Sequence, residues 1–234
     1  MNCVWCDQQI LLQLNWQQFF KANNSPALCT ECRLRLDILS GDRCEICSRP
    51  TEKRICHDCQ AWRNINWQRM NTNLIEDPLD FNISVFSYNE FMKDLMATWK
   101  YRGDYVLVKA FEQAFIKAFL EHFSDIGKDA ELVPIPLSQE RLLERGFNQS
   151  LLLAQLLPLP IREILSRQHG EKQAKKSRIE RIQADNPFII EETINKTVIL
   201  VDDIYTTGST LRHAASLLKQ NGCPNVYAFT LIRG

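Results

Sequence analysis

The sequence predicts an α/β protein whose sheet is mostly parallel, preceded by a small cysteine-rich module. Two observations support this. Eight of the nine cysteines fall before residue 60, whereas the rest of the chain alternates β-branched apolar runs with amphipathic helical segments. A chain of 234 residues also has room for one ordinary domain and a small one. We therefore expect the cysteine-rich module at residues 1–62, a linker at 63–84 and the α/β domain at 85–234.

The composition is that of an ordinary globular protein without net charge. Apolar residues make up 45% of the chain and charged residues 24%, and 28 basic residues balance 28 acidic ones. A protein that coats nucleic acid by bulk charge usually carries a basic excess. Any polyanionic partner must therefore be met by a local basic patch.

The sequence favours a cytoplasmic protein without a membrane segment. The stretch MNCVWCDQQILLQL lacks the basic and apolar regions of a signal peptide. No run of about 18 apolar residues is present either. In the cytosol thiols stay reduced, so paired cysteines are expected to bind metal rather than to form disulfides.

The first eight cysteines form four C-x-x-C pairs, a spacing that lets two thiolates reach one metal ion. The pairs are Cys3/Cys6, Cys29/Cys32, Cys44/Cys47 and Cys56/Cys59. Two pairs close a tetrahedral shell, so four pairs predict two zinc ions that are structural rather than catalytic. Sequential pairing of the pairs is favoured, although spacing alone also allows an interleaved arrangement. An iron–sulfur cluster is the minor alternative.

Aromatic residues crowd into this module. Trp5, Trp16, Trp62 and Trp67 lie in or beside it. They could supply the core that so small a module otherwise lacks, or they could stack on nucleobases. His57 could replace a thiolate, but it also fits a solvated position beside the last pair.

Past the cysteines, strands and helices alternate, which is typical of a parallel sheet covered on both faces. Strands are expected at 81–88, 131–138, 196–205 and 225–233. Helices are expected at 91–104, 106–123, 150–157 and 209–222, the first stopped near Gly103 and the last closed by Gly222. Cys223 follows that last helix and is expected to be a buried structural thiol.

The segment from Val198 to Thr210 is the most informative in the chain. A buried strand ends in two adjacent carboxylates, Asp202 and Asp203, at the sheet edge where open α/β folds bind ligands. A loop of small hydroxyl residues around Gly208 then enters a helix, and its backbone N–H groups could bind one phosphate. Because carboxylates repel phosphate, they would instead accept hydrogen bonds from vicinal hydroxyls. A 5-phosphorylated ribose satisfies both requirements.

A plain strand–turn–helix with an N-cap residue is the alternative, but it leaves the two adjacent acids unexplained. The order of the parts matches the fingerprint of type I phosphoribosyltransferases, which bind phosphoribosyl pyrophosphate. It is neither a Walker A loop nor a dinucleotide-binding glycine motif.

Further motifs narrow this resemblance. They are Trp99-Lys-Tyr-Arg-Gly-Asp104, Val133-Pro-Ile-Pro-Leu137 and Glu144-Arg-Gly-Phe-Asn-Gln149. Together with the fingerprint they resemble the ComF/GntX family of phosphoribosyltransferase-like proteins, and the C-x-x-C pairs resemble the double zinc ribbon of that family. The resemblance spans nearly the whole chain and implies a type I phosphoribosyltransferase-like fold for its α/β part.

The resemblance implies a role for individual residues. Asp202 and Asp203 would bind the ribose. The 5-phosphate loop would consist of Thr206, Thr207, Gly208, Ser209 and Thr210. The pyrophosphate side would consist of Lys100, Arg102, Pro134, Ile135, Pro136, Arg141, Arg145 and Asn148. Mg²⁺ would accompany the pyrophosphate, held mainly by ligand oxygens and water. For Arg141 and Arg145, a solvated helix face is an equally good interpretation.

The chain departs from the family pattern in two places. Ser138 stands where the family commonly has His, and the Thr and Leu of the family motif are missing from residues 166–186. The segment from 167 to 181 is strongly basic, through Arg167, Lys172, Lys175, Lys176, Arg178 and Arg181. It could close over pyrophosphate, contact a DNA backbone, or be a solvated loop.

The family implies a role in natural competence. We therefore expect a cytoplasmic competence factor that handles incoming single-stranded DNA in natural transformation, together with other DNA-uptake proteins, and that binds phosphoribosyl pyrophosphate. The alternative is an active phosphoribosyltransferase that transfers a phosphoribosyl group to an unidentified acceptor and releases pyrophosphate. The sequence leaves open whether the chain is an enzyme, and it names no catalytic residue.

Overall fold

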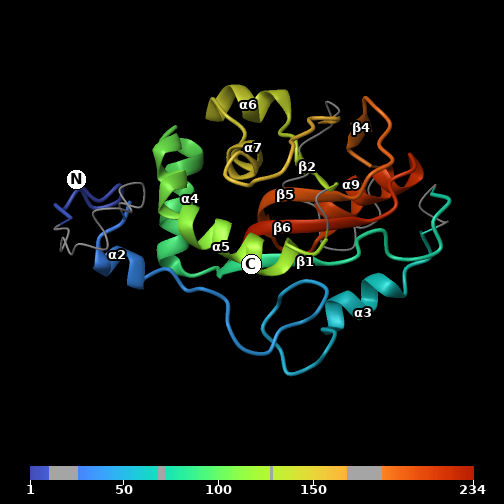
Figure 1. Ribbon diagram of the computed structural model, residues 1–234, viewed down its shortest axis with the longest axis horizontal. Helices are drawn as coiled ribbons and strands as arrows, with labels where there is room; N and C mark the ends of the chain where they lie inside the picture. The colour runs from blue at the N-terminus through green and yellow to red at the C-terminus, as the bar shows by residue number, and fades with distance from the viewer. Residues whose placement is uncertain (11–25, 68–71, 127–128, 168–185) are drawn as a thin grey trace.

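Four parallel strands form the sheet at the centre of the molecule. The computed structural model describes residues 1–10, 26–67, 72–126, 129–167 and 186–234. Within them β1 (Asn82–Ser87), β2 (Glu131–Pro134), β5 (Val198–Tyr205) and β6 (Val226–Arg233) are arranged in the order β1-β6-β5-β2 (Figure 1). Each neighbouring pair is parallel. The predicted parallel sheet is confirmed, although β2 is shorter than expected because prolines donate no ladder hydrogen bonds.

The sheet is buried on both faces. In β5, Val198 and Leu200 belong to one apolar cluster, together with residues of α9 (Ser209–Gln220). Ile199 and Val201 belong to the other cluster, which includes residues of α4, α5 and α7. Successive strand residues point to opposite faces, so a continuous apolar run supplies both layers.

The helices on that second face are α4 (Glu90–Tyr101), α5 (Glu112–Phe123) and α7 (Gln149–Ala154). The prediction of one continuous helix over 106–123 is wrong, because a 3₁₀ helix, η2 (Tyr105–Ala110), precedes α5. Two β-branched valines lower the α-helical propensity of this first turn. None of the described helices has the length and apolar character needed to cross a bilayer.

A short helix follows β2, as the solvated helix face considered for Arg141 and Arg145 requires. Helix α6 (Gln139–Arg145) begins where the Ser138 hydroxyl accepts a hydrogen bond from the N–H of Arg141 at 3.4 Å. It ends at Gly146, whose φ of 77° is the left-handed conformation that glycine adopts without strain. Ser138 therefore has a structural role as a helix cap.

A second sheet of two antiparallel strands was not predicted. It pairs β3 (Leu165–Arg167) with β4 (Phe188–Ile190). The basic segment lies between these strands, and apart from Arg167 its residues fall outside the described part of the chain. These are Lys172, Lys175, Lys176, Arg178 and Arg181.

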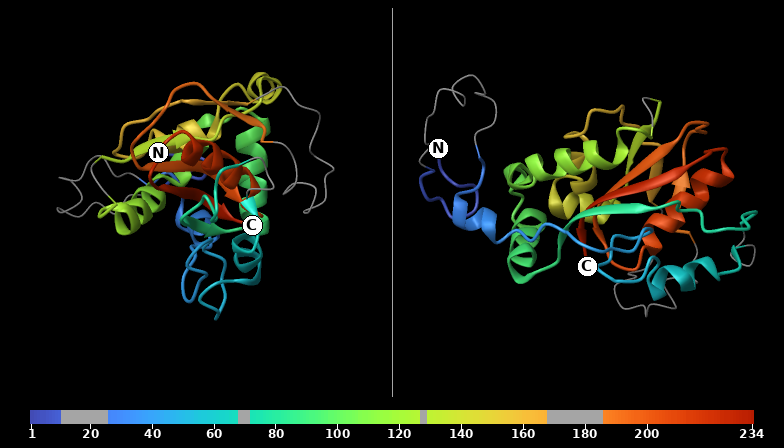
Figure 2. Two further views of the ribbon diagram at one scale, coloured as in Figure 1. Left: turned by 90° about the vertical axis from the view of Figure 1, so that its right-hand side faces the viewer. Right: turned by 60° about the horizontal axis from the view of Figure 1, so that its bottom comes forward.

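The two halves of the cysteine-rich region lie in different places. The first, with α2 (Thr30–Leu34), lies at one end of the molecule beyond α4 (Figure 2). The second, with α3 (His57–Arg63), is bonded to the start of β1, since the N–H of Asn82 donates to the carbonyl of Ile46 at 2.7 Å. The domain limits expected at 62 and 84 stay predictions.

Candidate functional site

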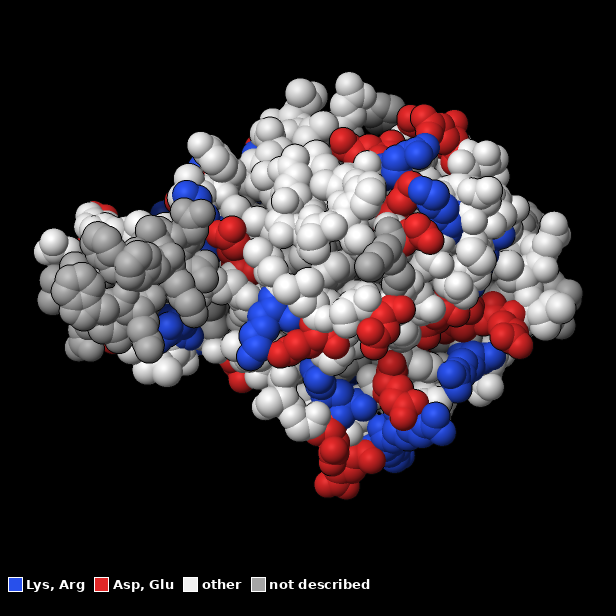
Figure 3. All heavy atoms as spheres, viewed as in Figure 1, with Lys and Arg blue, Asp and Glu red and all other residues white. Residues whose placement is uncertain are grey.

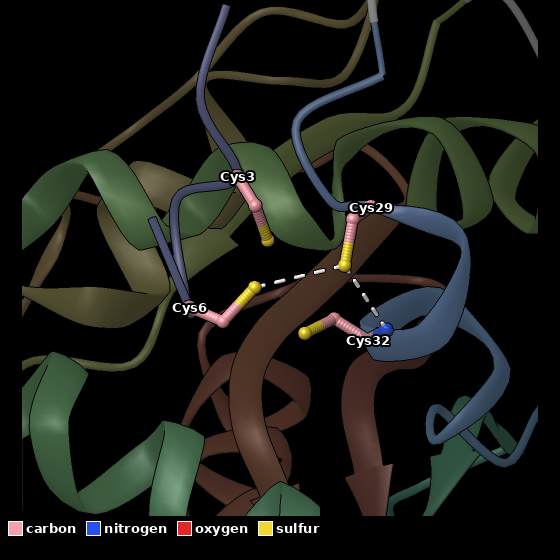
Figure 4. Close-up of side chains that lie close together, drawn as sticks. All are labelled: Cys3, Cys6, Cys29 and Cys32. Carbon is pink, nitrogen blue, oxygen red and sulfur yellow. Dashed lines mark hydrogen bonds between the residues drawn. The ribbon is translucent and has the colours of Figure 1, made fainter. Parts of the chain in front are cut away.

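The first four cysteines converge on one point. In Figure 4 the sulfurs of Cys3, Cys6, Cys29 and Cys32 face a common centre, from two separate turns of the chain. The Sγ atoms of Cys6 and Cys29 are 3.7 Å apart. The backbone N–H of Cys32 points at Cys29 Sγ at 3.5 Å, as donors do in thiolate knuckles.

The second four cysteines repeat this arrangement with deeper burial. Cys44, Cys47, Cys56 and Cys59 are all buried, and their sulfurs lie within 4.8 Å of one another. In each group the first pair sits on a knuckle turn that is followed by a residue with φ of 59°. In each group the second pair sits at the start of a short helix. The sequential pairing expected from the sequence is therefore confirmed.

Both groups could hold zinc. Four thiolates at about 2.3 Å from one tetrahedral ion lie about 3.8 Å from each other. The Sγ atoms of Cys6 and Cys29 are 3.7 Å apart and those of Cys47 and Cys56 are 3.6 Å apart, and all four sulfurs of each group lie within 4.8 Å of one another. Iron ions standing between the thiolates would hold them further apart, so the geometry favours a single ion in each group. All four positions are filled by cysteine, which is typical of a structural site.

Two of the tryptophans beside these cysteines form a core rather than a binding surface. Trp62 and Trp67 are each 1% exposed, and their rings stack with centroids 5.9 Å apart. Neither ring has a free face for a nucleobase. Trp5 packs edge-on against Phe91, and Trp16 lies outside the described residues.

The paired acids occupy the carboxyl end of β5. Ser150, in the first turn of α7, donates its hydroxyl to Asp202 Oδ1 at 3.0 Å, and the N–H of Asp203 donates to the same oxygen at 2.9 Å. Lys100, near the end of α4, forms an ion pair with Asp203 in which both side chains are largely buried. Three elements that are distant in sequence thus meet at the acid pair.

The acid pair has unusual electrostatics. Burial raises the pKa of Asp202 to about 7, and the neighbouring charge of Asp203 adds to this effect. The hydrogen bonds from Asp203 and Ser150 and the charge of Lys100 lower the pKa but are outweighed. Asp202 therefore changes its charge near neutral pH, as groups in ligand sites often do.

Residues 206–210 connect the acid pair to α9. Gly208 directly precedes this helix and has a φ of 77°. A Cβ atom there would collide with the hydroxyl of Tyr205 and the guanidinium of Arg212, so the position requires glycine. The loop lies at the N-terminus of a 12-residue helix, where the helix dipole favours an anion.

The segment after β2 runs beside the acid pair. Ile135 is buried, its N–H donates to the carbonyl of Val201 at 2.9 Å, and its own carbonyl accepts from the side chain of Asn148 at 3.1 Å. The side-chain oxygen of Asn148 accepts from the N–H of Ser150 at 3.0 Å, which caps α7. Asn148 therefore fixes both Ile135 and the helix that presents Ser150 to Asp202.

Two buried donors near this cap lack a hydrogen-bond partner in the described part of the chain. Arg145 donates through Nη1 to Gln149 Oε1 at 2.8 Å, and its guanidinium carbon lies 5.7 Å from the ring centroid of Tyr101. The Nε atom of Arg145 and the Nε2 atom of Gln149 are buried, and neither has a hydrogen-bond partner among the described residues. Such donors are costly to bury unless a ligand accepts their hydrogen bonds.

The other predicted cations lie in two places. Burial lowers the pKa of Arg167, the charge of Arg141 adds to this effect and the charge of Asp202 opposes it. Arg102 instead lines a cavity of about 620 Å³ between α4 and the N-terminal module, together with Trp5 and Asp104. Of the predicted cations, Lys100 pairs with an acid of the site, whereas Arg102 lines this separate cavity.

Sequence reasoning missed Ser150 and Gln149 as site residues. Both directly follow Asn148, a good N-cap residue, so a helix start at the sheet edge was a signal that could have found them. It also missed the pairing of Lys100 with Asp203, which no local pattern contains.

On the face drawn in Figure 3, basic and acidic side chains lie beside one another rather than in a patch of one sign.

These features define a protein with a phosphoribosyltransferase-like domain. A family model described as "Phosphoribosyl transferase domain" matches residues 143–234, which include α7, β5, the loop and α9. A hypoxanthine phosphoribosyltransferase structure from Staphylococcus aureus covers 60% of this chain and 64% of its own at 18% identity, with a TM-score of 0.26. The fold assignment depends on the sheet and the domain match, since so low a score carries no weight.

Relatives that match along nearly the whole chain identify the family more specifically. The chain is 39% identical over 238 residues to "Competence protein ComFC" of Bacillus subtilis, covering 99% of this chain and 94% of that protein. It is 30% identical to "Competence protein ComFC" of Streptococcus pneumoniae, over 100% of both chains. It is 27% identical to "DNA utilization protein YhgH" of Escherichia coli, over 89% of this chain and 97% of that one. The chain therefore belongs to the ComF family.

Proposed function

We propose that this protein binds phosphoribosyl pyrophosphate together with Mg²⁺ at the carboxyl end of β5. The observation that carries the proposal is the arrangement of Asp202 and Asp203 directly before a glycine loop at the start of α9. The acids accept hydrogen bonds from the 2- and 3-hydroxyls of the ribose, and the loop donates to the 5-phosphate.

The pyrophosphate lies toward α6 and α7 in this proposal. Arg141 and Arg145 neutralise its charge, and the buried donors of Arg145 and Gln149 that have no partner among the described residues supply hydrogen bonds. The wall on that side consists of Pro134, Ile135, Pro136 and Asn148. Lys100 leaves Asp203 when the ribose hydroxyls arrive and then faces the pyrophosphate. Mg²⁺ is held mainly by ligand oxygens and water.

We further propose that this ligand site serves natural transformation. The relatives in Bacillus and Streptococcus are named as competence proteins, and those in enteric bacteria as DNA utilization proteins. The protein would act in the cytoplasm, where reduced thiols keep the cysteines available for zinc. It would handle incoming single-stranded DNA through the basic segment that begins at Arg167.

Calorimetry tests the ligand claim. Wild type should bind phosphoribosyl pyrophosphate in the presence of Mg²⁺, whereas the double variant Asp202→Ala with Asp203→Ala should show at least about 100-fold weaker binding at unchanged zinc content, because two charge-assisted hydrogen bonds are lost. The control is Glu191→Ala with Glu192→Ala, which removes two adjacent exposed acids and should bind normally. Wild type that does not bind would refute the ligand claim.

A transformation assay with the same variants connects the site to the role. The Asp202 and Asp203 double variant should lose transformants while the Glu191 and Glu192 control retains them. Normal transformation by a variant that no longer binds ligand would separate the site from the role. Pyrophosphate release over a panel of nucleobases and amines then shows whether binding is accompanied by turnover.

A further inference from the structure

The second cysteine group is joined to the phosphate loop by a direct hydrogen bond. Trp62 lies in α3, three residues after Cys59, and is 1% exposed. Its indole Nε1 donates to the carbonyl oxygen of Thr207 at 2.8 Å. The donor and acceptor are 145 positions apart in sequence. A residue of the cysteine-rich module thus fixes the backbone of the loop through a hydrogen bond.

A buried arginine supports the same loop. Arg212, in α9, is fully buried and forms three hydrogen bonds with the carboxylate of Asp77 at 2.9–3.0 Å. It also donates to the hydroxyl of Tyr205 at 2.7 Å, and its guanidinium carbon lies 4.6 Å from the ring centroid of Trp62. A buried charge with this many partners is held in one position.

The loop backbone rests on these side chains. The space that a Cβ at Gly208 would need is occupied by the Tyr205 hydroxyl and by Arg212 Nη1. On the other side, Arg233 Nη1 donates to the carbonyls of Tyr205 and Thr206 at 3.1 Å. Arg233 Nη2 lies 3.8 Å from the sulfur of Cys47. Contacts from the second cysteine group therefore reach the loop along two routes.

The first cysteine group has no such connection in the described part of the chain. Its buried members belong to the apolar cluster on the opposite face of the sheet, with α4 and α5. The second group belongs to the cluster that contains α9. The two groups are thus alike in ligand geometry but differ in what they support.

We propose that Trp62 and Arg212 are positioning residues for the 5-phosphate loop, so that affinity for a phosphorylated ribose depends on the second metal centre and not on the first. This inference rests on the proposed function, because it assigns a support to the same ligand site. By linkage, a ligand that occupies the loop must also retain the second metal more tightly, by the same factor.

The test compares two tryptophan variants. Trp62→Phe keeps the ring stack but loses the hydrogen bond to Thr207. Trp67→Phe is the matched control, because it loses the same atoms from the partner ring, whose Nε1 has no hydrogen-bond partner among the described residues. Ribose 5-phosphate and inorganic pyrophosphate with Mg²⁺ serve as calorimetric probes. Only ribose 5-phosphate carries the 5-phosphate that the loop is proposed to bind.

We expect Trp62→Phe to bind ribose 5-phosphate about three- to tenfold more weakly than wild type, the effect of one hydrogen bond, with unchanged pyrophosphate affinity and two zinc ions per chain. Trp67→Phe should bind both probes as wild type does. Equal loss for both probes, or no loss for ribose 5-phosphate, would overturn the inference. Wild type that binds neither probe would refute the proposed function itself.

A second measurement on wild type does not depend on the folding of any variant. In the presence of a chelator, ribose 5-phosphate should slow the release of one of the two zinc ions, and inorganic pyrophosphate should not. Release of both ions at rates unaffected by ribose 5-phosphate would contradict the coupling even where the sugar phosphate binds.

Discussion

Asp202 combines burial, a like-charged neighbour and a hydrogen bond from Ser150 within one carboxyl group. Its pKa of about 7 lies well above the value of about 3.9 for an unfolded aspartate. Between these values the folded protein holds a proton that the unfolded chain releases. The free energy of unfolding therefore falls as the pH rises through this window, and the stabilising contribution is lost above pH 7.

The variant Asp202→Asn should remove this pH dependence. Its side-chain oxygen can still accept from Ser150 and from the N–H of Asp203, but it carries no charge. We expect its melting temperature to exceed that of wild type by several degrees at pH 8, since raising the pKa from about 3.9 to about 7 corresponds to roughly 4 kcal/mol, with the gain disappearing toward pH 4. Asp125→Asn, at an exposed position, is the control for charge alone. A gain that is constant over pH would speak against a titrating Asp202.

Gly208 offers a test of the loop at the residue scale. Gly208→Ala places a methyl group against Tyr205 and Arg212 as well as straining the backbone, and it should cost about 2–5 kcal/mol of unfolding free energy. Gly41→Ala has nearly the same φ of 74° but meets open space, so only the backbone cost of about 1–2 kcal/mol is expected. Urea denaturation of both variants measures the difference, and equal losses would argue against the tight fit at Gly208.

At the scale of elements, the two cysteine groups should release metal at different rates. Cys6 is exposed and Cys29 half-buried, whereas all four cysteines of the second group are buried in a cluster with residues of α9 and β6. A chelator should remove one zinc at least about tenfold faster than the other, because the second requires the core to open. Mild urea should accelerate the slow release only.

One cysteine variant in each group shows which group gives the fast phase of zinc release and which gives the slow phase. Cys6→Ser should abolish the fast phase and leave the melting of the sheet unchanged. Cys47→Ser should abolish the slow phase and lower the melting temperature, since it removes a ligand that lies inside the core. Two phases of equal rate in wild type would contradict the difference in burial.

Elements whose pattern is local could be predicted from the sequence. The strands follow from apolar runs, α9 from its amphipathic period and Gly222, and the metal groups from cysteine spacing. The break before α5 was missed, because the helical period continues across it and the low helical propensity of two valines is too weak a signal to set a boundary. The acids and the loop were predicted, but Ser150, the Lys100–Asp203 ion pair and the Trp62–Thr207 hydrogen bond join distant segments that no local pattern connects.

At the scale of the whole molecule, the chain has no net charge, so DNA binding depends on where the basic residues lie. If the basic segment binds single-stranded DNA, reversing Lys172, Lys175 and Lys176 to Glu should weaken binding and reduce the slope of log K against log salt by about 0.7 for each phosphate that the variant no longer neutralises. Fluorescence anisotropy over a salt series measures both quantities.

The control makes the same change of net charge elsewhere. Reversing Lys53, Lys109 and Lys117, which are exposed and distant in sequence from the basic segment, should leave the slope unchanged if DNA binds locally at that segment. Equal effects of the two triple variants would indicate that only the overall charge matters, and the basic segment would then have no special role.

The order of strands in the sheet has a consequence for biosynthesis. β6 lies between β1 and β5, so the sheet cannot close until the last strand has left the ribosome. Cys59 precedes the end of that strand by about 175 residues, which take roughly 10–35 s to translate at bacterial rates. During this time the second group of thiols lacks the β6 residues that bury it in the finished protein. A nascent chain that captures zinc before the sheet closes would protect these thiols, and zinc supply during translation should therefore limit the yield of folded protein.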